Sequence, residues 1–432
     1  MRGPGRNSSL LRRMRGRGVA RLGVARLGLA RLGLARLGVA VAVAIAGLAG
    51  CSGSQATALP SASPTAVTPS PSPAATAPAT ATFPAAPTPT AAGAGLFTAA
   101  GSMDAARVNA TLLRDGRVLM VGGHDDSGDA VASAQLFDPR SGAYTAVAGT
   151  LTEARFDPAV TELRDGRVLA AGGEGGSQAP LATAEIFDPS SGTFKATGSM
   201  KTARSGASAF LLTNGTVLVF GGRDASGEAL ASAEVFDPNS SQFSSTGSMT
   251  AARDAFGAAQ LRDGRLLVVG GCCNVANPYA SAELYDPNTG IFTVTGSMGV
   301  GRMFPALAVL ADGRVLVAGG NSSAVYEKSL ASVELFDPKT GTFAATGAMK
   351  TPRDGLDATR LRDGRVLISG GAGGLDASAE LFDTATGTST LTGKMTTYRA
   401  GQTTTTLLQD GRVFIAGGGA GQEAHSAEIY QP

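Results

Sequence analysis

Short apolar runs separated by polar turns recur about every 50 residues through most of this chain. In the unit that follows Arg253, small residues lead to an Asp-Gly turn at 263–264, and four apolar residues follow at 266–269. Asp-Gly between two apolar runs is a strong hairpin signal, because the tight turn needs positive φ at both positions. Two more short runs, at 282–285 and 292–294, flank an Asp-Pro turn whose proline presets φ. The pattern predicts four short antiparallel strands per unit.

The turn phrase and the glycine pair that follows it occur seven times. The phrases begin at Asp115, Asp165, Asn214, Asp263, Asp312, Asp363 and Asp410, at spacings of 50, 49, 49, 49, 51 and 47 residues. A period of this length indicates a repeat architecture, and four-stranded repeats are typical of propeller blades. The last unit has only three expected strands, whereas the run at 96–103 reads as a fourth strand without a blade. We therefore predict an all-β fold: a seven-bladed propeller of four-stranded antiparallel blades over 94–432, with the last blade closed by the N-terminal strand.

The phrases Asp-Gly-Arg-Val-Leu and Glu-Leu-Phe-Asp-Pro, with the glycine pair, resemble kelch repeats, especially bacterial ones similar to the propeller domain of galactose oxidase. The resemblance covers 97–432 and implies a propeller, but the fold alone does not fix a function. Many kelch repeats carry Trp in the fourth strand, and this chain has no Trp. Aromatic residues take that place in five repeats: Tyr144, Phe194, Phe243, Phe292 and Phe343. The sixth repeat has only Ser389 there, so we expect its blade to be the least stable.

The copper site of galactose oxidase, which the resemblance raises, would require His and Tyr ligands. The chain has two histidines, His124 and His425, in the first and last repeats. We therefore expect no copper chemistry and no cofactor. Ring closure would make the two loops neighbours, and a metal site with Asp125 and Asp126 is a less favoured alternative to ordinary polar loops.

The first 50 residues hold ten Arg and no acidic residue. An apolar run at 39–48 follows, and then Leu48-Ala49-Gly50-Cys51, which resembles a bacterial lipobox. A basic region, an apolar region and a small-residue site are typical of a secretory signal peptide over 1–50. We expect cleavage before Cys51 and its lipidation. A plain membrane anchor helix is the alternative, but the apolar run is short of the roughly 20 residues that a span needs. Translation could begin at Met1 or at Met14.

Residues 51–93 are rich in Ala, Pro, Ser and Thr, and no charged residue occurs among them. Such a composition buries no core, so this segment is predicted to be a disordered tether. The whole chain has 36 basic and 34 acidic residues. Without the ten leader arginines, 26 basic and 34 acidic residues remain, a net charge of −8. An acidic domain without a basic run argues against nucleic-acid binding.

The loops after the glycine pairs differ most between repeats and should share one face. A partner would therefore contact residues of these loops. The candidate binding residues are His124, Asp125, Asp126, Arg223, Asp224, Cys272, Cys273, Asn274, Tyr279, Tyr326 and His425. Cys272 and Cys273 are adjacent, and outside the cytoplasm they could form a vicinal disulfide or stay as two thiols.

An arginine opens every first strand, and a third-strand glutamate recurs in six repeats. The arginines are Arg107, Arg155, Arg204, Arg253, Arg302, Arg353 and Arg399. The glutamates are Glu185, Glu234, Glu283, Glu334, Glu380 and Glu428, with Gln135 in the first repeat. One pair per blade predicts a structural ion-pair network, because buried charges must be paired. The alternative is a ring of these arginines around one channel mouth that binds an anionic ligand.

These observations predict a monomeric extracytoplasmic scaffold, held to the cell membrane by a lipidated Cys51, that binds an unknown protein or cell-envelope partner through the loop face. Few aromatic residues (5%) and no Trp weaken the case for a glycan partner. An envelope hydrolase or oxidase with a site over the channel mouth is the alternative, and a passive spacer is a third possibility.

Overall fold

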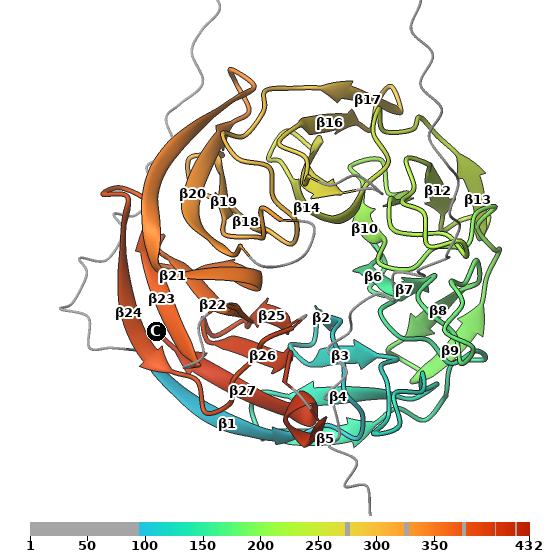
Figure 1. The fold of residues 1–432 in the computed structure, drawn as a ribbon. Coiled ribbons are helices and arrows are strands. Elements are labelled where there is room, and N and C mark those ends of the chain that lie inside the picture. Colours follow the sequence, from blue (N-terminus) through green and yellow to red (C-terminus); the bar gives the residue numbers. More distant parts are fainter. Residues whose placement is uncertain (1–94, 273–276, 324–327, 374–376, 402, 420) are drawn as a thin grey trace, which may run out of the picture. The chain divides into compact units, whose positions relative to one another are not determined.

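The computed structural model describes residues 95–272, 277–323, 328–373, 377–401, 403–419 and 421–432. The chain divides into two compact units, and all of these residues belong to the unit that contains 89–432. They form β-sheets and one short 3-10 helix, η1 (Gly421–His425). Figure 1 shows the sheets as blades around a common axis, with the first strand of each repeat innermost. In these residues no helix is long and apolar enough to cross a membrane.

Each repeat supplies its strands in order from the axis outward. Repeat one forms β2 (Ala110–Leu112), β3 (Val118–Val121), β4 (Ala134–Asp138) and β5 (Ala143–Ala146). Repeat two forms β6 (Ala159–Glu162), β7 (Val168–Ala171), β8 (Ala184–Asp188) and β9 (Thr193–Ala196). Repeat three forms β10 (Ser208–Leu211), β11 (Val217–Phe220), β12 (Ala233–Asp237) and β13 (Gln242–Ser245). Repeat four forms β14 (Asp254–Gln260), β15 (Leu266–Cys272), β16 (Ala282–Asp286) and β17 (Ile291–Val294). Repeats five and six form β18 (Ala306–Val309), β19 (Val315–Ala318), β20 (Leu330–Asp337), β21 (Thr342–Arg360), β22 (Val366–Ala372), β23 (Ser378–Asp383) and β24 (Thr388–Lys394). Repeat seven forms β25 (Thr403–Leu407), β26 (Val413–Gly417) and β27 (Ser426–Gln431), and β1 (Leu96–Ser102) joins it.

Five sheets are separate and four-stranded, whereas repeats five and six form one seven-stranded sheet. The prediction of seven separate blades is therefore wrong for these two repeats. The long strand β21 pairs with β20 through residues 342–353 and with β22 through 354–360. Pro352 is the only proline at this place in the seven repeats. Because a residue before proline is held extended, Thr351 continues the strand where the other repeats bend.

The N-terminal strand closes the ring. β1 pairs antiparallel with β27, so that the last sheet runs β1-β27-β26-β25. Phe97 lies opposite Tyr430, with their ring centroids 4.8 Å apart. The Met103 N–H also donates to the carbonyl of His425 at 2.7 Å. The predicted closure of the last blade is confirmed, and this blade has no open edge where β1 covers β27.

The hydrophobic core lies between neighbouring blades. The second strands β3, β7, β11 and β19 are buried along their whole length. Leu119 of repeat one packs in one cluster with Val168 and Phe187 of repeat two. Burial of each such side chain contributes about 1.5–3 kcal/mol, so a blade gains much of its stability from its neighbours. In repeat six, Phe382 faces Ser389 instead of an aromatic residue.

Candidate binding face

The arginine that opens each repeat is completely buried. The exposed fraction is 0–1% for Arg107, Arg155, Arg204, Arg253, Arg302, Arg353 and Arg399. In repeats two to seven its guanidinium lies 2.5–3.5 Å from a carboxylate of the third-strand glutamate. The glutamates Glu185, Glu234, Glu283, Glu334, Glu380 and Glu428 are 0–6% exposed. The two charges therefore neutralise each other inside the blades, and these arginines do not form a ring at an open channel mouth.

Arg253 shows how one buried pair is satisfied. Its Nη1 donates to the carbonyl oxygens of Gly270 and Ser281 at 2.7 and 3.2 Å, and Nη2 donates to the Ser281 hydroxyl at 2.8 Å. Nε and Nη2 both donate to Oε1 of Glu283, at 3.2 and 3.1 Å. The second carboxylate oxygen accepts the backbone N–H of Thr250 at 2.7 Å. The pair has hydrogen-bond partners around both charged groups, as buried charges require.

The first repeat neutralises its arginine with different residues. Gln135 stands where the other repeats have glutamate, and its amide oxygen accepts the backbone N–H of Asp104 at 3.1 Å. The Asp104 carboxylate pairs with Arg107 at 2.5 Å. Burial lowers the pKa of Arg107, and Asp104 opposes that effect. Sequence reasoning missed Asp104, although a repeat with glutamine in place of glutamate must find its negative charge elsewhere.

The same arginines join neighbouring blades through the backbone. The carbonyl of Arg155 accepts the N–H of Gly123, in the preceding repeat, at 2.9 Å. The bond recurs as Gly173–Arg204, Gly222–Arg253, Gly271–Arg302, Gly320–Arg353 and Gly371–Arg399. At Gly122, which has φ of +64°, a Cβ would lie 2.2 Å from the Arg155 carbonyl oxygen. The glycine pairs are therefore required by this close approach of two blades.

The loops after the glycine pairs and the links between repeats lie at the same ends of the strands, on what we call the GG-loop face. On this face two side chains of neighbouring repeats interact. One belongs to the residue that follows a glycine pair, and the other to the residue that follows the buried arginine of the next repeat. Arg223 Nε lies 2.5 Å from the Asp254 carboxylate, and Asn321 Nδ2 donates to Asp354 at 2.9 Å. Sequence reasoning selected Arg223 and missed Asp254 and Asp354. The sequence does mark these two aspartates, because the residue after the buried arginine differs between repeats, just as the loop residues do.

The backbone next to these pairs is strained at one recurring position. Asp157, Ala255 and Phe304 adopt φ of 50°, 54° and 49°, each two residues after a buried arginine. The left-handed conformation costs a residue with a side chain about 1–2 kcal/mol, and such strain gathers at functional surfaces.

The Asp157 carboxylate also contacts the preceding repeat, because the Asn109 side chain donates to it at 3.0 Å. Burial raises the pKa of Glu174, and the charge of Asp157 adds to the effect.

The loops of the first and last repeats meet, as ring closure predicts. His425 Nε2 lies 3.1 Å from the Asp126 carboxylate. His124 has other partners: its Nδ1 contacts the Asp125 carbonyl at 2.9 Å, and its ring centroid lies 5.2 Å from that of Phe156. Within the described part of the chain, no group of three His, Cys, Asp or Glu side chains could hold a metal ion. The two histidines at this junction therefore have different partners.

Several of the remaining candidate binding residues have structural partners. Asp125 accepts the backbone N–H groups two and four residues ahead at 2.8 and 3.1 Å, and Asp224 does the same at 2.8 and 3.0 Å. The Cζ atom of Arg253 lies 5.1 Å from the centroid of the Tyr279 ring, so this ring packs on the guanidinium. Cys272 is buried at the end of β15. Four candidates lie outside the described residues: Cys51, Cys273, Asn274 and Tyr326. Lipidation and the vicinal disulfide thus stay predictions.

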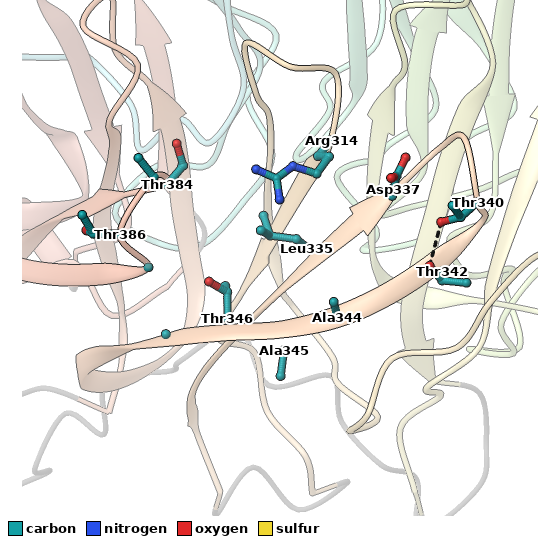
Figure 2. A pocket seen from close by; sticks show the side chains of 13 residues that line it. Arg314, Leu335, Asp337, Thr340, Thr342, Ala344, Ala345, Thr346, Thr384 and Thr386 are labelled. Carbon is teal, nitrogen blue, oxygen red and sulfur yellow. Dashed lines mark hydrogen bonds between the residues drawn. The ribbon is translucent and has the colours of Figure 1, made fainter.

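A hollow of about 700 Å³ lies between repeats five and six. Figure 2 shows Arg314 and Asp337 of repeat five at its wall, with Thr384 and Thr386 from the turn of repeat six. The rest of the wall consists mainly of Ala, Thr and Gly residues. This lining offers hydrogen bonds but no arranged nucleophile and base of the kind that an active site needs.

Comparison with known proteins establishes kelch motifs and the propeller arrangement. The Kelch motif matches residues 206–250 and 258–299. No curated protein matches the chain. A solved fungal alcohol oxidase of the AA5 family, in complex with copper, is similar with a TM-score of 0.63 and 19% sequence identity. The similarity covers 79% of this chain and 76% of the oxidase chain. At this identity the likeness concerns the fold alone.

Proposed function

We propose that this protein is a monomeric extracytoplasmic scaffold, anchored to the membrane through Cys51, that binds a protein or cell-envelope partner through the GG-loop face. One observation carries the proposal: the charged side chains divide into two groups. Those that most repeats share pair within their own repeat, as Arg253 does with Glu283 inside the blade and Asp263 with Arg265 in the Asp-Gly turn. Those that differ, such as Arg223 with Asp254, gather on the GG-loop face. Residues that repeat hold the scaffold, and residues that vary on a rigid scaffold suit recognition of a partner.

We further propose that the seven repeats act as seven blades. β21 serves as the outermost strand of repeat five and the innermost strand of repeat six. Its residues 342–353 pair with one neighbour and residues 354–360 with the other, so no residue belongs to both pairings. The shared strand supports a stiff junction between two blades.

The leader and the tether support the anchor. The apolar run at 39–48 ends shortly before Cys51, and the uncharged tether follows. The test is incorporation of a labelled fatty acid by the full chain and by Cys51→Ala in a bacterial host. We expect label only on the unaltered chain and release of the variant into the soluble fraction. Label on both proteins, or on neither, would contradict the anchor.

The binding role is tested by affinity capture from envelope extracts with the full chain. We expect a partner that is lost with the double variant Arg223→Ala, Asp254→Ala. The matched control is the double variant Arg117→Ala, Asp115→Ala, which removes an ion pair from the opposite face. Equal loss with both variants would contradict recognition through the GG-loop face. A stoichiometric transition metal in the purified chain, measured by elemental analysis, would contradict a role in binding alone.

A further inference from the structure

A second set of arginines surrounds the other end of the channel. The turns from first to second strands and from third to fourth strands form the DGR face, opposite the GG-loop face. The residue before the Asp-Gly turn is arginine in four repeats, and we call Arg114, Arg164, Arg262 and Arg362 the ring arginines. All four are exposed, with 61% of the Arg114 side chain open to solvent. Because each lies two residues after the end of an innermost strand, they surround the channel mouth.

The aspartates of the Asp-Gly turns do not neutralise the ring arginines. Each of these aspartates is held by the arginine two residues later, as Asp263 is by Arg265 at 2.7 Å. The same pair recurs in repeats one, two, five, six and seven. Glu162 lies 3.3 Å from Arg114, and no other carboxylate of the described residues forms an ion pair with a ring arginine. The mouth is therefore positive, although the chain without its leader is acidic.

Neighbouring repeats hold three of the four ring guanidiniums in place. Arg114 Nη2 donates to the carbonyl of Arg164, Arg164 Nη2 to that of Thr213, and Arg362 Nη2 to that of Gln409. Gln409 in turn donates to the Arg114 carbonyl at 3.1 Å. These bonds link repeats six, seven, one, two and three in a chain. A guanidinium has five donors, so most of them stay available to a ligand in a fixed orientation.

We propose that the ring arginines bind a soluble polyanion that carries repeated phosphate groups. Arginines on four different blades offer separate contacts, which suits a polymer better than one small anion. Guanidinium and phosphate form paired hydrogen bonds, and several weak contacts combine through multivalency. Membrane-surface binding adds buried apolar area to charge. No exposed large apolar residue of the described chain lies beside the ring arginines in the Asp-Gly turns.

The probe is fluorescent inorganic polyphosphate, titrated with the purified full chain and followed by anisotropy. The ring variant carries Arg114→Gln, Arg164→Gln, Arg262→Gln and Arg362→Gln. An exposed ion pair is worth about two- to threefold in affinity, so four lost contacts should weaken binding about 30-fold. The matched control carries Arg117→Gln, Arg167→Gln, Arg265→Gln and Arg365→Gln, which removes the same charge from the same repeats and face. We expect its affinity to change less than threefold.

A gain-of-function variant keeps the proposal testable if the ring variant fails to fold. Thr213 and Ala311 occupy the ring position in repeats three and five. Thr213→Arg with Ala311→Arg should tighten binding about sixfold on the same reasoning. Equal losses in the ring and control variants, or no gain from the added arginines, would overturn the proposal. Binding to anionic vesicles without binding to polyphosphate would also overturn it, and would assign this face to a membrane. None of these outcomes bears on the GG-loop face, whose test uses other residues.

Discussion

Removal of one buried guanidinium should weaken the whole propeller. Arg253→Ala leaves the Glu283 carboxylate buried without its cation, and it takes the donor from the carbonyls of Gly270 and Ser281. Breaking a buried ion pair costs about 3–5 kcal/mol. For a domain of roughly 340 residues, an unfolding entropy of about 2 cal/mol/K per residue converts 4 kcal/mol into a Tm lower by roughly 6 °C. Calorimetry of the full chain measures this shift.

The first repeat supplies a rescue experiment for the same pair. Glu283→Gln copies Gln135 and leaves Arg253 without its carboxylate, so we expect a loss of similar size. Thr250 occupies the position that Asp104 has in the first repeat. Thr250→Asp should therefore restore stability in the Glu283→Gln background and not in the unaltered chain. A Tm for Arg253→Ala within about 1 °C of the parent, where about 6 °C is expected, would refute the reasoning. Equal effects of Thr250→Asp in both backgrounds would refute the rescue.

Three further outcomes follow from single residues. Burial raises the pKa of Asp357 to about 7, against the opposing hydrogen bond from Thr403. The folded chain therefore binds a proton that the unfolded chain has released above about pH 4, and this contribution is lost as pH rises through 7. We expect Asp357→Asn to be more stable than the parent at pH 8 by only about 1–2 kcal/mol, because solvent screens the half-buried Asp357 side chain. At pH 4 we expect no gain in stability. An equal gain at both pH values, measured by urea unfolding, would contradict this. Gly270→Ala should cost about 2–4 kcal/mol, because its φ is +64° and the new Cβ would meet a carbonyl of the next repeat at 2.3 Å. Gly227→Ala, with φ of +78° and open space around it, should cost only about 1 kcal/mol, and equal costs in chemical denaturation would contradict the contact. Because Ser389 replaces an aromatic residue, amide hydrogens of β24 should exchange faster than those of β17, and slower exchange in β24 would show that repeat six is not the weak blade.

Most of the fold is predictable from the sequence because its signals recur. The Asp-Gly or Asn-Gly turns, the apolar second strands and the glycine pairs each appear seven times, and closure by the N-terminal strand follows from the order of the units. The shared strand β21 is not predictable in this way. It depends on Pro352, a single residue that holds its predecessor extended, and a pattern shared by all repeats does not contain it.

The GG-loop face is harder to predict because its pairs join different repeats. Arg223 meets Asp254, which lies 31 residues later and belongs to the next blade. Asp125 and Asp224 appeared to be free ligands in the sequence, but the structure uses both to close local turns. A polar residue in a variable loop is therefore a weak sign of binding until its backbone neighbours are known.

Arginine shows what separates a structural charge from an available one. Repeat four holds three: Arg265 binds Asp263 two residues away, Arg253 binds Glu283 within the blade, and Arg262 is exposed at the channel mouth. The first pair follows from local spacing. The second follows from the recurrence of both partners, since a buried charge must recur together with its counter-charge. The ring position carries arginine in four repeats, and the aspartate that follows it in each repeat pairs instead with the arginine two residues after that aspartate. A charged residue that recurs in the repeats, but is not paired with another recurring charge, is the one most available to bind a ligand.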